Sequence, residues 1–140
     1  MSEFLPRHIA ILCASYQRLT GRVLQAETMH TAPFAVVSHG IEPDPIFNYA
    51  NPTALELFEM DWATFTKLPS RFSAEALERE ARSSLLARVM VHGFVDDYSG
   101  VRISATGKRF MVKNATVWNL RDENGAYYGQ AALLKEWTYL

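Results

Sequence analysis

The fold is decided by residues 98–137, which read YSGVRISATGKRFMVKNATVWNLRDENGAYYGQAALLKEW. This stretch is rich in β-branched, aromatic and small residues, which suit a half-buried pleated surface. Two short segments, 105–108 and 122–125, interrupt it, and each contains a glycine that tolerates the positive φ of a tight hairpin turn. The stretch therefore predicts three antiparallel strands joined by two turns. The two turns set the register in which the strands pair.

Two longer helices are predicted upstream. Apolar residues recur at three- and four-residue intervals between Pro6 and Gly21, which is the spacing of an amphipathic helix. A helix of similar length is expected from Ser73, as its N-cap, to Gly93, which ends it. The first of these helices needs apolar surface to cover, either on its own sheet or on the same helix of a second subunit.

Shorter elements are predicted between these helices. Two apolar runs, 34–38 and 46–50, lie on either side of a proline-containing loop and predict a first hairpin. Asn51 followed by Pro52 is typical of an N-cap and a proline at the first helical position. Asp61 is expected to cap a second short helix.

These elements form one α+β domain if the first hairpin pairs with the late strands. We expect a five-stranded antiparallel sheet with helices on one face and the N-terminal amphipathic helix on the other. Strand alternation favours cover on both faces, because it places Phe110 and Val112 on one side and Met111 and Val117 on the other. Within a single structural domain, residues 1–33 form the N-terminal helix and connector and residues 34–140 form the core.

Composition narrows the class of protein. The 140 residues suit one domain, and a net charge of −1 offers no global field for nucleic acid or an anionic membrane. The single cysteine, Cys13, excludes an intramolecular disulfide and favours a reducing compartment, so we expect a cytoplasmic protein. No apolar run is long enough for a membrane span, and neither nucleic acid nor a membrane is expected as a partner.

Six motifs are distributed along the chain, and they are Ser15-Tyr16-Gln17-Arg18-Leu19-Thr20-Gly21, Phe47-Asn48-Tyr49-Ala50-Asn51, Leu68-Pro69-Ser70-Arg71, Tyr98-Ser99-Gly100-Val101-Arg102-Ile103-Ser104, Gly107-Lys108-Arg109-Phe110 and Val117-Trp118-Asn119-Leu120. These motifs resemble the MEKHLA domain, a family similar to PAS sensory domains. The resemblance implies a PAS-like core, a role in sensing a signal, and regulated dimerisation. It brings no established catalytic residues.

A PAS-like core implies a pocket between the inner face of the sheet and the helices, where a ligand could alter helix packing. Strand residues with polar groups are the first candidates, and aromatic residues could form the opposite wall. The candidates are Tyr98, Arg102, Asn114, Trp118 and Gln130 on the strands, and Phe47, Tyr49 and Trp62 opposite them. The alternative for each of these side chains is to pack in the core, or to face solvent or pair with a neighbouring charge, without contacting a ligand. Residues Ile9, Leu12, Tyr16 and Leu19 of the N-terminal helix are candidates for a homodimer interface.

The cofactor is unknown, and two familiar ones are disfavoured. A flavin adduct needs a cysteine in the central helices, whereas Cys13 precedes the sheet. Haem needs an axial histidine, and only His92 is even loosely placed for that role. His30, His39 and Asp44 lack the short spacing of a metal site, so no metal site is expected.

Three functions fit the sequence. The first is a non-catalytic PAS-like module that binds a small molecule and changes its helix packing or dimer geometry. The second is a structural homodimerisation domain without a ligand. The third is a small isomerase or dehydratase in which Asp97, His92 or Tyr98 carries a proton.

Overall fold

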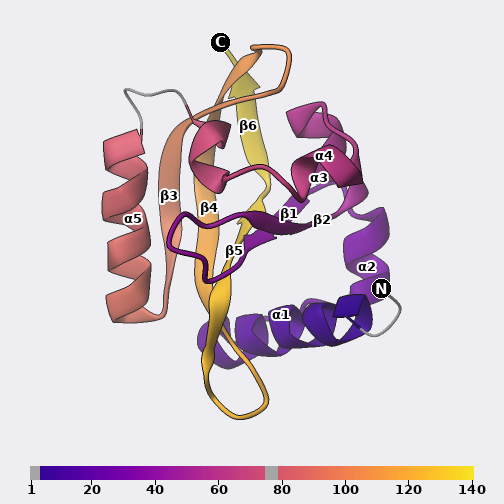
Figure 1. Ribbon diagram of the computed structural model, residues 1–140, viewed down its shortest axis with the longest axis vertical. Helices are drawn as coiled ribbons and strands as arrows, with labels where there is room; N and C mark the ends of the chain where they lie inside the picture. Colours follow the sequence, from indigo (N-terminus) through magenta and orange to yellow (C-terminus); the bar gives the residue numbers. More distant parts are fainter. Residues whose placement is uncertain (1–3, 75–78) are drawn as a thin grey trace.

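The computed structural model describes residues 4–74 and 79–140. Figure 1 shows a central twisted sheet with helices packed on both sides of it. The elements, in chain order, are α1 (Phe4–Thr20), α2 (Ala26–Thr31), β1 (Ala35–His39), β2 (Phe47–Ala50), α3 (Pro52–Phe58), α4 (Trp62–Phe65), the 3₁₀ helix η1 (Ser70–Ser73), α5 (Arg79–His92), β3 (Phe94–Ile103), β4 (Arg109–Arg121), β5 (Tyr127–Leu134) and β6 (Glu136–Tyr139).

The sheet is antiparallel with the strand order β2-β1-β5-β4-β3. The early hairpin joins the late strands because β1 pairs with β5, with Ala35 opposite Leu134 and His39 opposite Gln130. The predicted α+β fold and the pairing of its five strands are confirmed. One detail is added, since the last strand is interrupted at Lys135 and continues along β4 as β6.

The two faces of the sheet carry separate cores. Val37 of β1 belongs to the inner core with α3 and α4, whereas Val36 belongs to the outer core with α1. Helix α5 covers the inner face beside β3, where Leu85 and Val89 pack on Val117. Because α1 and α5 lie on opposite faces, apolar side chains of the strands are buried on both sides.

A bulge in β4 changes which residues face the inner core. Asn114 has φ of +54°, a conformation that asparagine tolerates better than most residues, and the pairing with β3 shifts register near this point. Phe110 and Val112 face inward before the bulge, and Val117 also faces inward after it. The prediction that Val117 lies opposite Phe110 is therefore wrong, because simple alternation does not continue through a bulge.

Helix boundaries follow the predicted caps with one exception. The Oδ1 atoms of Asn51 and Asp61 accept hydrogen bonds from the backbone N–H groups of Ala54 (3.1 Å) and Thr64 (2.8 Å), as expected for N-caps. Ser73 does not start the long helix, because it ends η1 and its hydroxyl donates to the carbonyl oxygen of Ser70 at 2.7 Å.

The start predicted for the long helix extends into 75–78, which lie outside the described residues. The described part of that helix begins at Arg79 and ends at His92. Among the helices of the described ranges, none combines the length and the apolar character that crossing a bilayer requires.

Candidate functional site

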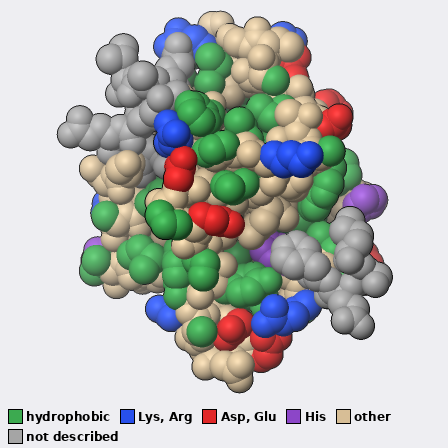
Figure 2. Space-filling view, in the orientation of Figure 1, with side chains coloured by type: hydrophobic (Ala, Val, Ile, Leu, Met, Phe, Trp, Pro, Cys, Tyr) green, Lys and Arg blue, Asp and Glu red, His purple; other side chains and the backbone are tan. Residues whose placement is uncertain are grey.

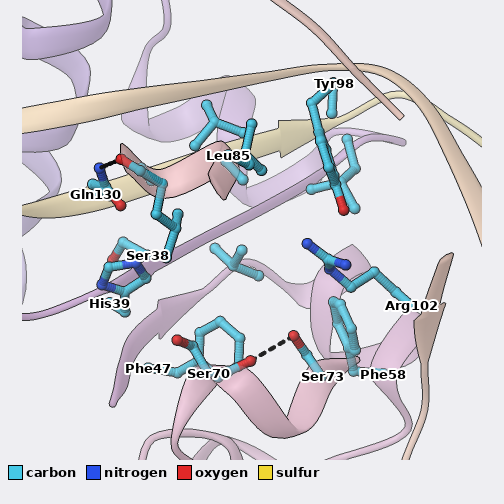
Figure 3. Close-up of a pocket in the computed structure, with 17 residues that line it drawn as sticks. Ser38, His39, Phe47, Phe58, Ser70, Ser73, Leu85, Tyr98, Arg102 and Gln130 are labelled. Carbon is cyan, nitrogen blue, oxygen red and sulfur yellow. Dashed lines mark hydrogen bonds between the residues drawn. The ribbon is translucent and has the colours of Figure 1, made fainter. Parts of the chain in front are cut away.

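A cavity of about 70 Å³ lies between the inner face of the sheet and the helices α3, η1 and α5. Figure 3 shows the side chains that surround it. Its volume is about half of the ~150 Å³ cavity that admits benzene, and well below the ~300–1,000 Å³ of pockets for larger ligands. The space therefore suits a molecule of only a few non-hydrogen atoms.

The walls of this cavity are mostly apolar. Strands β1, β2, β4 and β5 contribute one surface, and helices α3 and α5 contribute the other. The apolar lining residues are Val37, Phe47, Phe58, Leu85, Leu86, Ala115, Val117, Ala131, Ala132 and Leu134. The side chain of Ala132 is small and only half-buried although it lies mid-sheet, because the cavity adjoins it.

One end of the cavity is formed by a fixed amide. The Nε2 group of Gln130 donates to Oδ1 of Asn119 at 3.0 Å and to the carbonyl oxygen of Leu86 at 3.3 Å. Nδ2 of Asn119 in turn donates to the carbonyl oxygen of Val89 at 2.9 Å. The bonds to Leu86 and Val89 join the sheet to the backbone of α5, and the Oε1 atom of Gln130 is left toward the cavity (Figure 3).

The other end is formed by three residues of β3 that share a face. The Tyr98 side chain lies over Gly100, where a Cβ atom would collide with the Tyr98 hydroxyl. The guanidinium carbon of Arg102 is 5.0 Å from the centre of the Tyr98 ring, and Nη1 donates to the carbonyl oxygen of Val101 at 3.0 Å. Figure 3 shows the guanidinium and the Tyr98 hydroxyl directed toward each other at this end.

Four of the eight residues proposed from the sequence line the cavity. These are Phe47, Tyr98, Arg102 and Gln130. They come from three strands that are distant in sequence, and the antiparallel pairing of β1 with β5 brings β2 and β5 into the same wall.

The other four residues lie elsewhere, and the structure corrects their placement. Tyr49 and Trp62 pack edge to face, with ring centres 5.9 Å apart, in the outer core with α1. Trp118 is buried in the same core, where its Nε1 group donates to the carbonyl oxygen of Leu12 at 3.3 Å. Asn114 is exposed and its Nδ2 group donates to Glu136 at 3.5 Å. The bulge at Asn114 explains the error on β4, since it turns the odd-numbered residues after it inward.

Sequence reasoning missed Asn119 and several residues with small or polar side chains. Asn119 holds the amide of Gln130, and Ser38, His39, Ser70 and Ser73 contribute to the lining. Asn119 follows Val117 by two positions, so the bulge at Asn114 was the signal that would have placed it on the inner face.

A buried histidine connects α1 to the strand beside the cavity. The Ser38 hydroxyl donates to Oδ1 of Asn48 at 2.5 Å, so it accepts from Nε2 of His8, which is 2.8 Å away. Burial of His8, together with the nearby charge of Arg7, lowers the pKa of His8 to about 4. His8 is therefore neutral at physiological pH.

The residues proposed for a dimer interface are used within the chain. Leu12 and Tyr16 are 0% and 3% exposed and pack on the outer face of the sheet, where the rings of Tyr16 and Trp118 are 4.8 Å apart. Ile9 and Leu19 are half-buried at the borders of the same contact. While α1 stays on the sheet, a second copy could touch Ile9 and Leu19 but not the buried Leu12 and Tyr16.

Asp97, His92 and Cys13, which were weighed for proton transfer or as cofactor ligands, lie outside the cavity. Asp97 is exposed and paired with Arg88 at 3.4 Å, and His92 is exposed at the end of α5. Cys13 lies on α1, on the opposite face of the sheet, and burial raises the pKa of its thiol. Over 4–74 and 79–140, no three His, Cys, Asp or Glu side chains converge as metal ligands would. Of the residues weighed for proton transfer, only Tyr98 lines the cavity.

Comparison with solved structures identifies the fold. The PAS domain of a protein from Colwellia psychrerythraea superimposes with a TM-score of 0.66 at 14% identity, over 79% of this chain and 92% of that domain. A fungal LOV domain photoreceptor gives a TM-score of 0.68 at 18% identity, over 92% of this chain and 90% of that one. Both likenesses establish a PAS fold and no more than the fold.

Comparison of sequences identifies the family. The homeobox-leucine zipper protein ATHB-9 of Arabidopsis thaliana is 25% identical over 96 residues, which are 69% of this chain and 11% of that protein. The chain thus corresponds to a small part of this relative. The family model described as the MEKHLA domain matches residues 6–139. Because this match spans almost the whole sequence, the chain belongs to the MEKHLA domain family.

Proposed function

We propose that this PAS-like sensory module binds a small molecule in the cavity of the inner face and transmits its presence to α5, without catalysing a reaction. The observation that carries this proposal is the double role of Gln130. Its side chain lines the cavity and also donates to the backbone of α5 at Leu86. A ligand that hydrogen-bonds to the Gln130 amide changes the bonds that hold α5 to the sheet. Such a ligand binds one packing state of α5 more tightly than the other, and this difference in affinity shifts the equilibrium between the two states.

The remaining contacts of α5 favour such a response. The buried side chains Leu85 and Val89 attach the helix to the sheet, while Ala87, Arg88 and Met90 are exposed. Over residues 83–92, whose burial the structure describes, this narrow buried face makes the helix depend strongly on the two amide bonds to Leu86 and Val89. Loss of either bond should loosen α5 before it affects the sheet.

Native mass spectrometry of the chain purified from its own host tests ligand binding. The expected spectrum contains a bound species with the mass of a few non-hydrogen atoms, lost from a variant in which Ala132→Leu fills the cavity. The matched control is Ala10→Leu on the exposed side of α1, which should retain the bound species. Two results together would contradict the proposal. The spectrum of the wild-type chain would contain no bound species, and the hydrogen exchange of α5 would be the same in the host-purified and the refolded chain.

We include self-association of two copies and a cytoplasmic location in this proposal. Because Leu12 and Tyr16 are buried within the chain, the support for a dimer comes from exposed apolar residues elsewhere. Met90 and Val91 at the end of α5 are 48% and 79% exposed, and Figure 2 shows hydrophobic side chains gathered over this lower end of α5. A contact there would connect the ligand cavity to the geometry of a dimer through one helix.

A further inference from the structure

We propose, on the basis of the ligand-binding function above, that the ligand is a short neutral alcohol of three or four carbons. Its hydroxyl group donates to the Oε1 atom of Gln130, and its alkyl chain lies along the apolar floor of the same cavity. Figure 3 shows Gln130 at one end of this cavity. The ligand places no polar group at the other end, where Arg102 already contacts the Tyr98 ring and donates to the carbonyl oxygen of Val101 at 3.0 Å.

The orientation of the Gln130 amide is fixed by its neighbours. The carbonyl oxygen of Val89 accepts from Nδ2 of Asn119 at 2.9 Å, so Oδ1 of Asn119 is the atom directed toward Gln130. This Oδ1 atom and the carbonyl oxygen of Leu86 lie 3.0 and 3.3 Å from Nε2 of Gln130, and both atoms can only accept. A flipped amide would place its own oxygen against these two acceptors. Oε1 is therefore the atom left toward the cavity.

The Oε1 atom of Gln130 is a buried acceptor that lacks a donor. Gln130 is only 3% exposed, and Oε1 accepts no hydrogen bond from the part of the chain that the structure describes. Two hydroxyl groups among the lining residues donate elsewhere, Ser38 to Asn48 at 2.5 Å and Ser73 to the carbonyl oxygen of Ser70 at 2.7 Å. Because a buried acceptor without a donor is costly, a ligand hydroxyl that donates to Oε1 gains affinity.

The floor beyond Gln130 fits a short alkyl chain. Ala132 lies two residues further along β5, about 7 Å away, and lines the same cavity. Its partners across the sheet are Val37 of β1 and Val117 of β4, which also line the cavity, and Leu85 of α5 lines it from the helix side. Hydrocarbon on both sides favours methylene and methyl groups and makes a second polar group costly.

The volume and the apolar walls select a small neutral molecule. One water needs roughly 10–15 Å³ of such space, so the cavity of about 70 Å³ holds about five non-hydrogen atoms, the size of n-butanol. An alkylammonium ion could also donate to Oε1, but removing its charge from water costs far more than removing a hydroxyl group. A carboxylate brings a charge and no donor. The alcohol is the class that meets all these conditions.

A donor at Oε1 should fasten α5 to the sheet. A hydrogen bond accepted by Oε1 polarises the amide of Gln130 and strengthens the bonds that its N–H groups donate. These bonds end at the carbonyl oxygen of Leu86 and, through Asn119, at that of Val89. The alcohol therefore favours the state in which α5 is packed on the sheet.

Two isomers test the assignment on the whole chain. Diethyl ether has the same formula as n-butanol but no O–H group, and butyrate replaces the alcohol with a charged group. Their affinities are measured by nuclear magnetic resonance, from the side-chain amide signals of Gln130. We expect n-butanol to bind about tenfold more tightly than diethyl ether, because the ether leaves Oε1 without a donor. Equal affinities of the two isomers would overturn the role of Gln130, and tighter binding of butyrate than of n-butanol would overturn the neutral ligand.

Two variants then locate the ligand. Ala132→Leu fills the space for the alkyl chain and should abolish the binding of n-butanol, whereas Ala10→Leu on the exposed side of α1 should leave it unchanged. Gln130→Met removes the acceptor, so both isomers should bind this variant equally, whereas Gln17→Met at the surface of α1 should keep the tenfold difference. If Gln130→Met fails to fold, the isomers on the wild type decide. Unchanged binding of n-butanol by folded Ala132→Leu would overturn the placement.

Hydrogen exchange tests the response of α5. At twice its dissociation constant, n-butanol should slow the exchange of the α5 amides about threefold, because it binds only the state in which α5 is packed. The same concentration should leave Ala132→Leu unchanged, which controls for the general effect of alcohols on helices. Unchanged or faster exchange in the wild type would overturn the coupling to α5.

The outcome separates this inference from the function on which it rests. Another molecule retained in the native mass spectrum, with no binding of n-butanol, would overturn the alcohol and keep the ligand-binding function. A wild-type chain that retains nothing and binds none of the three probes would overturn both.

Discussion

At the scale of single residues, His8 shows how burial determines protonation. Its imidazole is enclosed between α1 and β1 and donates to Ser38 at 2.8 Å. Burial lowers the pKa of His8 to about 4, whereas histidine in an unfolded chain has a pKa of about 6.5. The unfolded chain therefore takes up a proton below that value while the folded chain does not.

The first prediction concerns the pH dependence of stability. The contribution of His8 is fully present above about pH 6.5 and is lost as the pH falls toward about 4, because protons then favour the unfolded chain. Between about pH 7.5 and about pH 5 this amounts to roughly 2 kcal/mol of unfolding free energy, measured by urea denaturation at both pH values. His8→Gln should lose this difference, whereas His30→Gln, an exposed histidine of α2, should retain it. An equal loss in the wild type and in His8→Gln would contradict it.

Asn51 shows what a sequence can and cannot reveal about one residue. Its N-cap role could be predicted from the proline that follows it. Its side chain also accepts from the N–H group of Val36 at 3.0 Å and donates to the carbonyl oxygens of Met29 and Phe34 at 2.8 and 2.9 Å. These three partners come from α2, β1 and the segment between them, so they depend on tertiary structure that no local pattern encodes.

At the scale of elements, both turns and the N-caps at Asn51 and Asp61 were predictable, whereas the cap at Ser73 and the effect of the bulge were not. Both turns of the late strands form at the glycines, where the N–H groups of Gly107 and Gly125 donate to the carbonyl oxygens of Ser104 and Asp122. The effect of the bulge at Asn114 on the register of β4 was not predicted, and two of the five strand candidates, Asn114 and Trp118, lie outside the cavity. Helix α2 was also missed, because six residues are too few to show a periodicity and tertiary bonds hold them.

The second prediction concerns the close approach of β5 to the end of β1. Gly129 has φ of +142°, and a Cβ atom there would collide with the carbonyl oxygen of His39. Gly129→Ala should therefore reduce the free energy of unfolding by about 3 kcal/mol, from backbone strain and from overpacking against backbone that cannot move aside. Gly107→Ala is the matched control, since its φ is also positive but its surroundings are open. It should lose only about 1 kcal/mol in the same urea titration. Equal losses for the two variants would show that the close approach is absent.

At the scale of the whole molecule, the sheet serves two purposes on its two faces. The outer face is a filled core in which Leu12, Tyr16 and Trp118 pack tightly, and the inner face keeps a cavity beneath α5. Sequence patterns could predict that both faces are covered, because apolar residues alternate to both sides. They could not predict which face keeps a cavity, because that depends on how side chains from β1, β4, β5 and α5 meet.

The third prediction distinguishes cover by α1 within the chain from cover by a second copy. Leu12 is fully buried on its own sheet, so Leu12→Ala should lower the free energy of unfolding by about 3 kcal/mol. The half-buried Leu19 provides the control, and Leu19→Ala should lose about 1 kcal/mol. The difference in unfolding free energy between the wild type and each variant should not change with protein concentration, because the contact of α1 lies within one chain. A midpoint that rises with concentration in the wild type and not in Leu12→Ala would instead place α1 on the sheet of a partner copy. If sedimentation shows dimers while the contribution of Leu12 to the free energy of unfolding does not depend on protein concentration, the dimer interface lies elsewhere. Val91→Glu, at the exposed end of α5, should then dissociate these dimers.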